Sequence, residues 1–380
     1  MKPQQRLWIL QNNVVPATYH QLVLAGVTKG ALDYFDRVLR QKLKQWLKLP
    51  HTTPNSFFYA DCKDGGLGLK CLRWIIPEMK ARRMIKIQRS ADPVMAGLAL
   101  TDWFQKEMAK WDLNARSLND GTPMTEKWNR DMAFRLELFS TADCYGLEYA
   151  HQVPYVHRWA TDGNLGMSGH RYCAAIALRS GVLYSRARSA RGRPEANSSC
   201  DCCGPNVVEH LGHILQVCSR TYGARIKRHD LLVMKIKKML EYHNWTVLVE
   251  PKIRTPNSET LFVKPDLLAW KEERSVVLDV AVCSDDLAPD IAHEQKVHKY
   301  SNVPQIAQYF REMGKEPPYF SAFAVNWRGV VSPKSAADLR SFGVRKWDIR
   351  LLSVATVEQG TVMHRLFQQS TARNSGWRVG

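Results

Sequence analysis

The chain has 380 residues, 45% of them hydrophobic, and carries a formal net charge of +18. This length and apolar fraction predict two or three packed domains, and no apolar run approaches the length of a membrane span. The basic excess predicts a polyanionic partner, while nine cysteines, an odd number, do not fit the disulfide framework of a secreted protein.

The first hundred residues predict a helical region with a basic face. Before Pro50, five apolar residues recur at helical spacing: Leu32, Phe35, Leu39, Leu43 and Trp46. The other side of the same segment carries arginines and lysines with few acids. Such a face can simply be solvated, but the shortage of acids favours a position near nucleic acid.

Two short motifs that follow resemble a polymerase motif and a phosphate-binding loop, but each lacks essential residues. Tyr59-Ala60-Asp61 hints at the metal-binding turn of a polymerase, but Cys62 stands where a second aspartate is needed. The stretch Gly65-Gly66-Leu67-Gly68 lacks the Gly-Lys-Ser/Thr ending of a phosphate loop. We therefore expect a turn with close backbone packing here, followed by another basic helix.

An arginine run follows the aromatic-rich segment 95–178, to which the sequence assigns no chemistry. The run holds five arginines and no acid: Arg179, Arg186, Arg188, Arg191 and Arg193. Guanidinium groups suit phosphate oxygens, and each neutralised phosphate releases counterions. We expect these arginines to bind nucleic acid rather than only to make the surface soluble.

Four residues of the next segment have the spacing of a closed metal site. They are Cys200, Cys203, His213 and Cys218. Three thiolates and one imidazole would complete a tetrahedral zinc shell, so the ion would be structural. Cys202 and His210 are alternative ligands, but Cys202 would strain the loop and His210 would close the ring less well.

A helix and a strand precede the main candidate site. Arg228, His229 and Asp230 lie near the start of the predicted helix. We expect Arg228 and His229 to contact DNA or the active site, although His229 can also orient a phosphate or cap the helix through Asp230. Residues 246–250 alternate like a strand, and Glu250 is a candidate accessory carboxylate.

The main candidate site lies in the following stretch. Two apolar, β-branched runs flank a charged turn at 271–274, which predicts two adjacent strands. Asp266 stands at the start of the first strand. Asp279 lies inside the apolar run of the second, where a carboxylate is costly unless it is paired or bound to a metal. Lys296 and Tyr300 follow, one helical turn apart.

Two aspartates and a lysine brought together suit metal-dependent phosphodiester hydrolysis. Carboxylate oxygens are ligands for Mg²⁺, which polarises the phosphate and lowers the pKa of the attacking water. The lysine adds positive charge where the transition state gains negative charge. Taken singly, Asp266 can be a strand-start carboxylate and Lys296 a solvated helix residue.

Beyond the site we expect a strand at 321–327, a terminal helix within 354–369 and a frayed tail at 370–380.

The pattern resembles the restriction-enzyme-like nuclease core, in which Pro-Asp is followed by Asp or Glu, one further residue and Lys. Here Ala281 stands at the usual lysine position, and the nearest substitute is Lys296 on the following helix. This displaced arrangement resembles the restriction-like endonuclease of site-specific non-LTR retrotransposons. The family order of Lys-Pro-Asp, Asp, Lys and Tyr matches Lys264-Pro265-Asp266, Asp279, Lys296 and Tyr300.

The resemblance extends over essentially the whole chain. Residues 49–93 resemble the thumb of the same reverse transcriptases, through Asp64-Gly65-Gly66-Leu67-Gly68, Leu72-Arg73 and Pro77. The family also has a Leu-x-x-Arg-x-x-Arg-Gly run before a zinc knuckle that ends in His-x₄-Cys, and Arg-His-Asn where this chain has Arg228-His229-Asp230. The interval before the knuckle histidine is slightly longer here than in the family.

The resemblance implies a multidomain protein with a helical thumb and linker, a small CCHC zinc knuckle and an α/β restriction-endonuclease-like (PD-(D/E)xK) C-terminal domain. The expected segments are 1–110 for the helical thumb-like region, 111–195 for the basic helical linker, 196–222 for the zinc knuckle and 223–380 for the endonuclease domain. No polymerase catalytic aspartates occur in the chain, so we expect it to be the C-terminal part of a larger protein.

What the family implies is a DNA endonuclease that nicks a chosen chromosomal site, commonly in ribosomal RNA genes, to prime reverse transcription. Its cofactors would be catalytic Mg²⁺ and structural Zn²⁺. Its partners would be double-stranded target DNA, element RNA and the rest of the reverse transcriptase, in the nucleus and its nucleolus, with no membrane. Two alternatives stay open: a catalytically idle binding module of the same protein, and a repair-type nuclease, which the knuckle and thumb-like region argue against.

Overall fold

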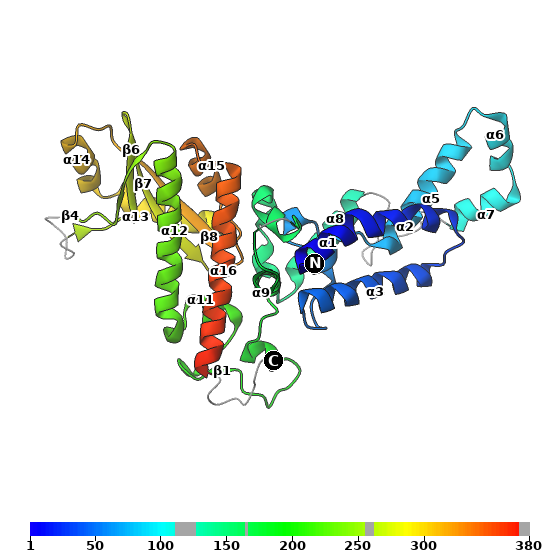
Figure 1. Ribbon diagram of the computed structural model, residues 1–380, viewed down its shortest axis with the longest axis horizontal. Helices are drawn as coiled ribbons and strands as arrows, with labels where there is room; N and C mark the ends of the chain where they lie inside the picture. Colours follow the sequence, from blue (N-terminus) through cyan, green and yellow to red (C-terminus); the bar gives the residue numbers. More distant parts are fainter. Residues whose placement is uncertain (111–126, 164–165, 255–261, 372–380) are drawn as a thin grey trace. The chain divides into compact units, whose positions relative to one another are not determined.

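The computed structural model describes residues 1–110, 127–163, 166–254 and 262–371, so most of the predicted tail and part of the predicted linker lie outside it. The chain divides into two compact units (Figure 1). The first comprises Met1–Cys62, Gly66–Ala142 and Ala160–Gly169, and the second comprises Lys63–Gly65, Asp143–Trp159 and His170–Gly380. The predicted knuckle and nuclease segments both fall in the second unit, while the predicted segment bounds stay predictions.

The first unit is helical, as the sequence predicts. Its elements are α1 (Pro3–Ile9), η1 (Leu10–Val14), α2 (Val15–Leu24), α3 (Lys29–Leu47), α4 (Asn55–Tyr59), α5 (Leu72–Gln88), α6 (Pro93–Ala99), α7 (Asp102–Lys110) and α8 (Lys127–Ser140), with η2 (Cys62–Asp64) at its boundary. The Thr28 hydroxyl caps the start of α3 by accepting from the Ala31 N–H. The helix ends where Lys48 adopts φ 54°, two residues before Pro50.

The buried side of α3 differs from the predicted apolar face. Phe35 is 42% exposed, whereas its neighbour Asp36 is 2% exposed. The Asp36 carboxylate accepts the backbone N–H groups of Leu72 and Arg73, each at 2.9 Å, at the start of α5. These N–H groups have no partner within their own helix and carry partial positive charge. The apolar spacing of the sequence therefore does not mark the buried side fully, because α3 packs through a compensated carboxylate as well.

The predicted glycine turn is confirmed at Gly66 and Gly68. A Cβ atom at Gly66 would lie 2.3 Å from the Ala60 carbonyl oxygen. Gly68 adopts φ 68°, a backbone conformation that residues other than glycine rarely take. The motif therefore brings two backbone segments together, as the sequence predicts.

The second unit combines helices with small sheets. Its helical elements are η3 (Tyr145–Leu147), η4 (Ala150–Gln152), η5 (Pro154–Ala160), α9 (Gly169–Arg179), α10 (Arg186–Ser189), α11 (Leu211–Gln216), η6 (Ser219–Thr221), α12 (Tyr222–Tyr242), α13 (Pro289–Ser301), α14 (Pro304–Glu312), α15 (Pro333–Ser341) and α16 (Lys346–Thr371). Its strands are β1 (Ser199–Cys200), β2 (Gly204–Val208), β3 (Thr246–Val249), β4 (Ile253–Arg254), β5 (Phe262–Val263), β6 (Leu267–Lys271), β7 (Arg274–Cys283) and β8 (Tyr319–Asn326). The expected strands at 246–250 and 321–327 are thus confirmed, and the terminal helix begins earlier than predicted.

The main sheet has the strand order β3-β6-β7-β8. The β3–β6 and β6–β7 pairs are antiparallel, and β7 pairs with β8 in parallel across a connection that contains α13 and α14. The predicted charged turn joins β6 to β7, with Glu272 at φ 54°. Parallel neighbours need such a crossover, because the chain must return to the same end of the sheet.

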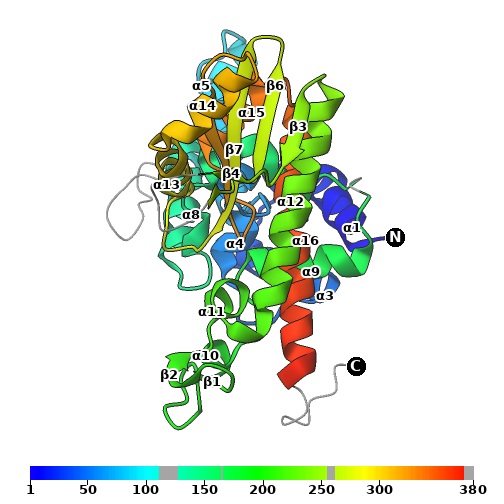
Figure 2. The ribbon, with the colours of Figure 1, turned by 90° about the vertical axis from the view of Figure 1, so that its left-hand side faces the viewer.

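Helices cover both faces of this sheet. On one face, Leu278 and Val280 pack with Ile236 of α12 and Leu352 of α16, and Figure 2 shows these two long helices side by side. On the other face, Val277 packs with residues of α13 and α14. Successive strand residues point to opposite faces, so Asp279 shares the face of Val277 and looks toward α13.

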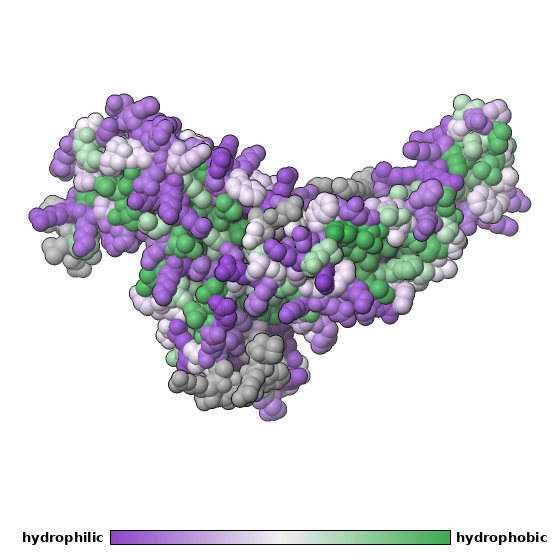
Figure 3. Space-filling view, in the orientation of Figure 1, coloured by the Kyte–Doolittle hydropathy of each residue, from purple (hydrophilic) through white to green (hydrophobic). Residues whose placement is uncertain are grey.

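Mostly hydrophilic side chains cover the visible face of each unit (Figure 3). The full sequence carries a net charge of +18. Among the described residues, no helix is both long and apolar enough to cross a membrane.

Candidate functional site

Asp279 is a buried carboxylate in the middle of β7. Its residue is 1% exposed, and Lys296 of α13 places its Nζ 2.5 Å from Oδ2. Burial raises the pKa of Asp279, and the negative charge of the nearby Asp266 raises it further. The Lys296 charge lowers this pKa, but the net shift is upward. The Lys296 ammonium is thus the close electropositive partner of Asp279 Oδ2. A metal ion at this oxygen would have to share it with the lysine.

Asp266 lies next to Asp279 because of the β6–β7 register. The strands pair Leu267 with Leu278, which brings the residue before β6 beside Asp279. Its Oδ2 accepts the Val280 N–H at 2.7 Å. Burial works to raise the pKa of Asp266, but the hydrogen bonds from His229 and Val280 outweigh it and lower that pKa overall. Asp266 is thus held ionised.

His229 of α12 completes the contacts of Asp266. Its Nε2 lies 3.0 Å from Asp266 Oδ2, and its Nδ1 lies 3.3 Å from Asp230 Oδ1. The hydrogen bond to Asp266 raises the pKa of His229 to about 8, although burial opposes the shift. The sequence left open whether this histidine faces a phosphate, caps the helix or enters the active site, and the structure places it against the candidate metal ligand.

The His229–Asp266 pair predicts a pH-dependent contribution to stability. Because the folded pKa of about 8 exceeds the ordinary 6.5, the contribution is fully present below pH 6.5 and is lost as pH rises through 8. For this partly exposed side chain we expect about 1 kcal/mol after solvent screening. Urea unfolding of the parent and His229→Gln should therefore differ more at pH 6 than at pH 9. A pH-independent difference, or the same trend in the exposed His298→Gln control, would contradict the assignment.

Tyr300 lies on α13 one turn after Lys296 and is 3% exposed. Its ring belongs to the apolar cluster under the sheet. Its hydroxyl donates to the Lys264 carbonyl at 3.3 Å and accepts from Lys299 Nζ at 3.0 Å. Burial and then the Asp279 carboxylate raise the pKa of Tyr300, so the phenol stays neutral. The structure thus brings Asp266, Asp279, Lys296 and Tyr300 together.

Glu250 lies at the edge of this group rather than inside it. It follows β3 with φ 49°, and its N–H donates to the Asp266 carbonyl at 2.9 Å. Its carboxylate pairs with Lys264 Nζ at 2.5 Å, and both side chains are at least 40% exposed. To act as an accessory carboxylate, Glu250 would therefore have to give up its ion pair with Lys264.

The four predicted zinc ligands meet in a second site of the same unit. The potential ligand atoms of Cys200, Cys203, His213 and Cys218 all lie within 4.8 Å of one another. Cys218 Sγ lies 3.9 Å from Cys200 Sγ and 3.8 Å from Cys203 Sγ. The buried His213 Nε2 has no hydrogen-bond partner among the described residues. Three thiols and an orphaned imidazole nitrogen fit a metal ion such as zinc.

The two alternative ligands lie outside this Cys3His cluster. His210 caps α11 instead, because its Nδ1 accepts the His213 N–H at 3.1 Å. Cys202 is not among the gathered residues. The preference for Cys200, Cys203 and His213 over these neighbours agrees with the geometry.

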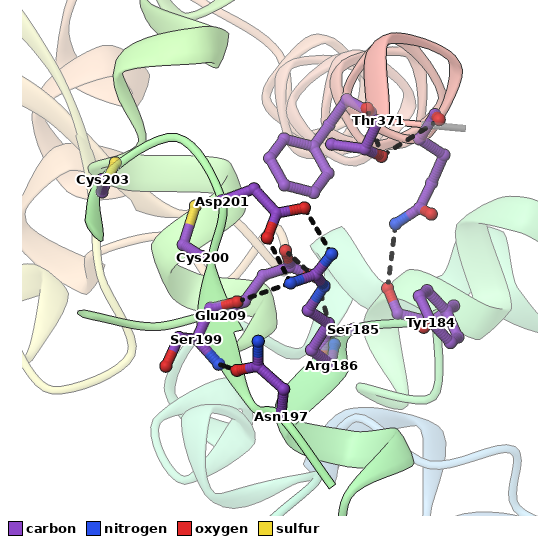
Figure 4. A network of polar contacts seen from close by, with 12 residues as sticks. Tyr184, Ser185, Arg186, Asn197, Ser199, Cys200, Asp201, Cys203, Glu209 and Thr371 are labelled. Carbon is purple, nitrogen blue, oxygen red and sulfur yellow. Dashed lines mark hydrogen bonds and ion pairs between the residues drawn. The ribbon is translucent and has the colours of Figure 1, made fainter. Parts of the chain in front are cut away.

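Arg186 fixes the loop that carries the first two cysteines (Figure 4). Its guanidinium pairs with both carboxylate oxygens of Asp201, between Cys200 and Cys203, and donates to the Ser199 carbonyl at 3.1 Å. Its backbone N–H donates to Glu209 Oε1 at 3.1 Å. Arg186 therefore ties α10 to the cluster loop, a role that the spacing of the arginine run did not reveal.

The other predicted nucleic-acid contacts differ in their access to the surface. Arg179 is fully buried and donates to the Gly65 and Arg328 carbonyls at 3.1 and 3.0 Å. Arg228 is 2% exposed. Both guanidinium groups are buried in this structure, so the predicted nucleic-acid contact by Arg179 and Arg228 stays a prediction that their burial does not favour.

Two arginines of the run share an acid, and another is exposed. Arg188 and Arg191 both pair with Asp143, the latter at 2.8 Å. The Arg191 side chain is half exposed, and Arg193 is exposed. Arg191 and Arg193 remain accessible for a phosphate contact, whereas the Arg188 side chain is only 13% exposed.

Comparison with known proteins finds relatives along the whole chain. The chain is 31% identical over 99% of its length to the "Retrovirus-related Pol polyprotein from type-2 retrotransposable element R2DM" of Drosophila melanogaster. It is 28% identical, over its full length, to the Pol polyprotein of a type-1 R2 element of Nasonia vitripennis, and 30% identical, over 91%, to that of Bradysia coprophila. The chain belongs to the R2 retrotransposon Pol family.

Membership of the R2 family confirms the resemblance to a non-LTR retrotransposon protein. The chain covers 35%, 36% and 39% of these three R2 relatives, so it corresponds to little more than a third of their length. No family model matches the chain.

Proposed function

We propose that this part of the R2 protein is a Mg²⁺-dependent, site-specific DNA endonuclease that nicks chromosomal DNA to start target-primed reverse transcription. The observation that carries the proposal is the meeting of Asp266 and Asp279 beside Lys296. Two neighbouring carboxylates, of which Asp279 is 1% exposed and has one lysine beside it, are costly to bury together. Perturbed, mutually interacting acids of this kind cluster at functional sites.

Asp266 and Asp279 are the residues that would hold Mg²⁺. The bound ion would polarise the scissile phosphate and lower the pKa of water. His229 donates from Nε2 to Asp266, which keeps that carboxylate ionised and oriented. Lys296 supplies fixed positive charge beside Asp279, where the pentavalent transition state gains negative charge. Tyr300 stays protonated and places a hydroxyl near Asp279.

The net charge and the family support a proposal about the partners. The basic excess of the chain, with the exposed Arg191 and Arg193 near the Cys3His cluster in the sequence, would bind the phosphates of the target duplex. The cluster would hold structural Zn²⁺ as a knuckle. For an R2-type element we propose a ribosomal RNA gene as the target. Further partners would be element RNA and the rest of the reverse transcriptase. The protein would act in the nucleus, at the nucleolus.

One observation favours the alternative of an idle binding module. The Lys296 ammonium already pairs with Asp279 at 2.5 Å, so the buried charge is compensated without an ion. An endonuclease must exchange part of this pairing for the metal, whereas a binding module need not.

A nicking assay separates the two functions. The chain is incubated with supercoiled plasmid carrying a ribosomal RNA gene, with Mg²⁺ or with EDTA, and gel shift measures binding in parallel. The endonuclease proposal expects open-circular product with Mg²⁺ and none with EDTA. Binding without nicking under both conditions would favour the idle module.

A further inference from the structure

One side chain links the Cys3His cluster to the carboxylate site. Gln216 is the last residue of α11, between the metal-ligand candidates His213 and Cys218. Its side-chain nitrogen donates to the carbonyls of Val282 at 3.1 Å and Cys283 at 2.5 Å. These are the final residues of β7, the strand that carries Asp279.

The other end of the same amide reaches α12. Gln216 Oε1 accepts from Arg228 Nη2 at 2.6 Å. Arg228 directly precedes His229, which contacts Asp266. A glutamine amide offers N–H donors on one side and an acceptor on the other. Since two carbonyls face its nitrogen and a guanidinium faces its oxygen, these partners fix the orientation of the amide.

Arg228 makes this link sensitive to disturbance. The residue is 2% exposed, and among the described residues its Nε and Nη1 have no hydrogen-bond partner. Burial, with the charge of Arg225, lowers the pKa of Arg228 to about 10. A buried cation with few acceptors is costly, so loss of the Gln216 oxygen would free the guanidinium to move, together with the helix turn that bears His229.

Resting on the nuclease function above, we propose that Gln216 is a positioning residue through which the ordered Cys3His cluster holds β7 and α12 in the arrangement that the carboxylate site needs. A bound metal orders the small loops and short helix that contain its ligands. Gln216 extends that order to the end of β7 by two hydrogen bonds and to α12 by a third. The two contacts to β7 join residues 66 and 67 positions apart in the chain.

Hydrogen exchange tests the link without DNA or catalysis. Exchange is followed by mass spectrometry on the whole chain with zinc bound and after zinc removal by a chelator. Zinc removal is expected to speed exchange at residues 280–283 and 225–230 by about tenfold. Gln216→Met, with its zinc retained, should speed exchange in the same two segments. Gln369→Met, the same substitution at an exposed position of α16, should leave both segments unchanged.

A second variant keeps the test decisive if Gln216→Met disturbs the cluster. Gln216→Glu preserves the size and the acceptor for Arg228 but places an oxygen against the two carbonyls of β7. It should speed exchange at 280–283. Parent-like exchange in both zinc-loaded variants would overturn the proposal. Loss of zinc from both would overturn it too, because Gln216 would then support the cluster itself.

Nicking kinetics add a readout that general destabilisation would not give. Gln216→Met is expected to lower kcat about tenfold while the KM for plasmid DNA stays unchanged, since the residue touches the site geometry and not the DNA. An equal rise in KM would contradict a positioning role. If the parent does not nick at all, the nuclease proposal fails, and the exchange measurement still decides whether Gln216 connects cluster and strand.

Discussion

Asp279→Ala is expected to lower the rate of nicking of supercoiled target DNA on the order of 10³-fold. The substitution removes one of two proposed metal ligands and leaves the Lys296 ammonium beside a void instead of a carboxylate. Losing metal-assisted stabilisation costs several kcal/mol of barrier. Binding of the plasmid, measured by gel shift, should change little, because the carboxylate is 1% exposed and cannot itself contact the DNA surface.

The matched control for this loss is Asp286→Ala. Asp286 lies seven residues further along the chain, is exposed and accepts a hydrogen bond from the Tyr145 hydroxyl. It should nick like the parent. Circular dichroism of both variants checks that the fold is kept. If Asp279→Ala nicks as fast as Asp286→Ala, the catalytic assignment of this carboxylate is wrong.

Cys218→Ser is expected to weaken zinc binding by on the order of 10²-fold or more. Cys218 is the cysteine whose sulfur lies near those of both Cys200 and Cys203, and a serine hydroxyl is a poor substitute for a thiolate ligand. Because metal binding is coupled to folding of such loops, hydrogen-exchange protection of residues 196–222 should fall with the metal. Zinc content per chain and exchange are measured on the same sample.

The neighbouring Cys202 provides the control for this prediction. It lies in the same loop but outside the gathered ligands, so Cys202→Ser should keep both its zinc and its protection. Equal zinc loss in the two variants would show that the ligand set has been assigned wrongly.

The sequence predicted the positions of the acids better than their surroundings. An aspartate inside an apolar strand can be recognised from composition alone, because its burial needs compensation. The two strands predicted around the charged turn at 271–274 could then bring Asp266 and Asp279 side by side. His229 was less certain, because its distance from Asp266 depends on how α12 packs across the sheet, and helix periodicity does not determine that packing.

The arginines show a limit of reasoning from charge. Arg179 and Arg186 belong to one acid-free run, yet the first is buried against backbone carbonyls and the second pairs with Asp201. Their partners come from segments distant in the chain, so no local pattern announces them. Asp36 is a similar case, since this carboxylate on the core side of α3 accepts N–H groups at the start of α5, far along the chain.

The most direct test of the central claim is to locate the divalent ion. Crystals of the chain soaked in Mn²⁺, which replaces Mg²⁺ and scatters anomalously, should show an anomalous peak bridged by the carboxylates of Asp266 and Asp279, with the Lys296 ammonium beside it. In Asp279→Ala crystals treated in the same way the peak should vanish. A fully soaked parent crystal with no peak between these two acids would contradict the account.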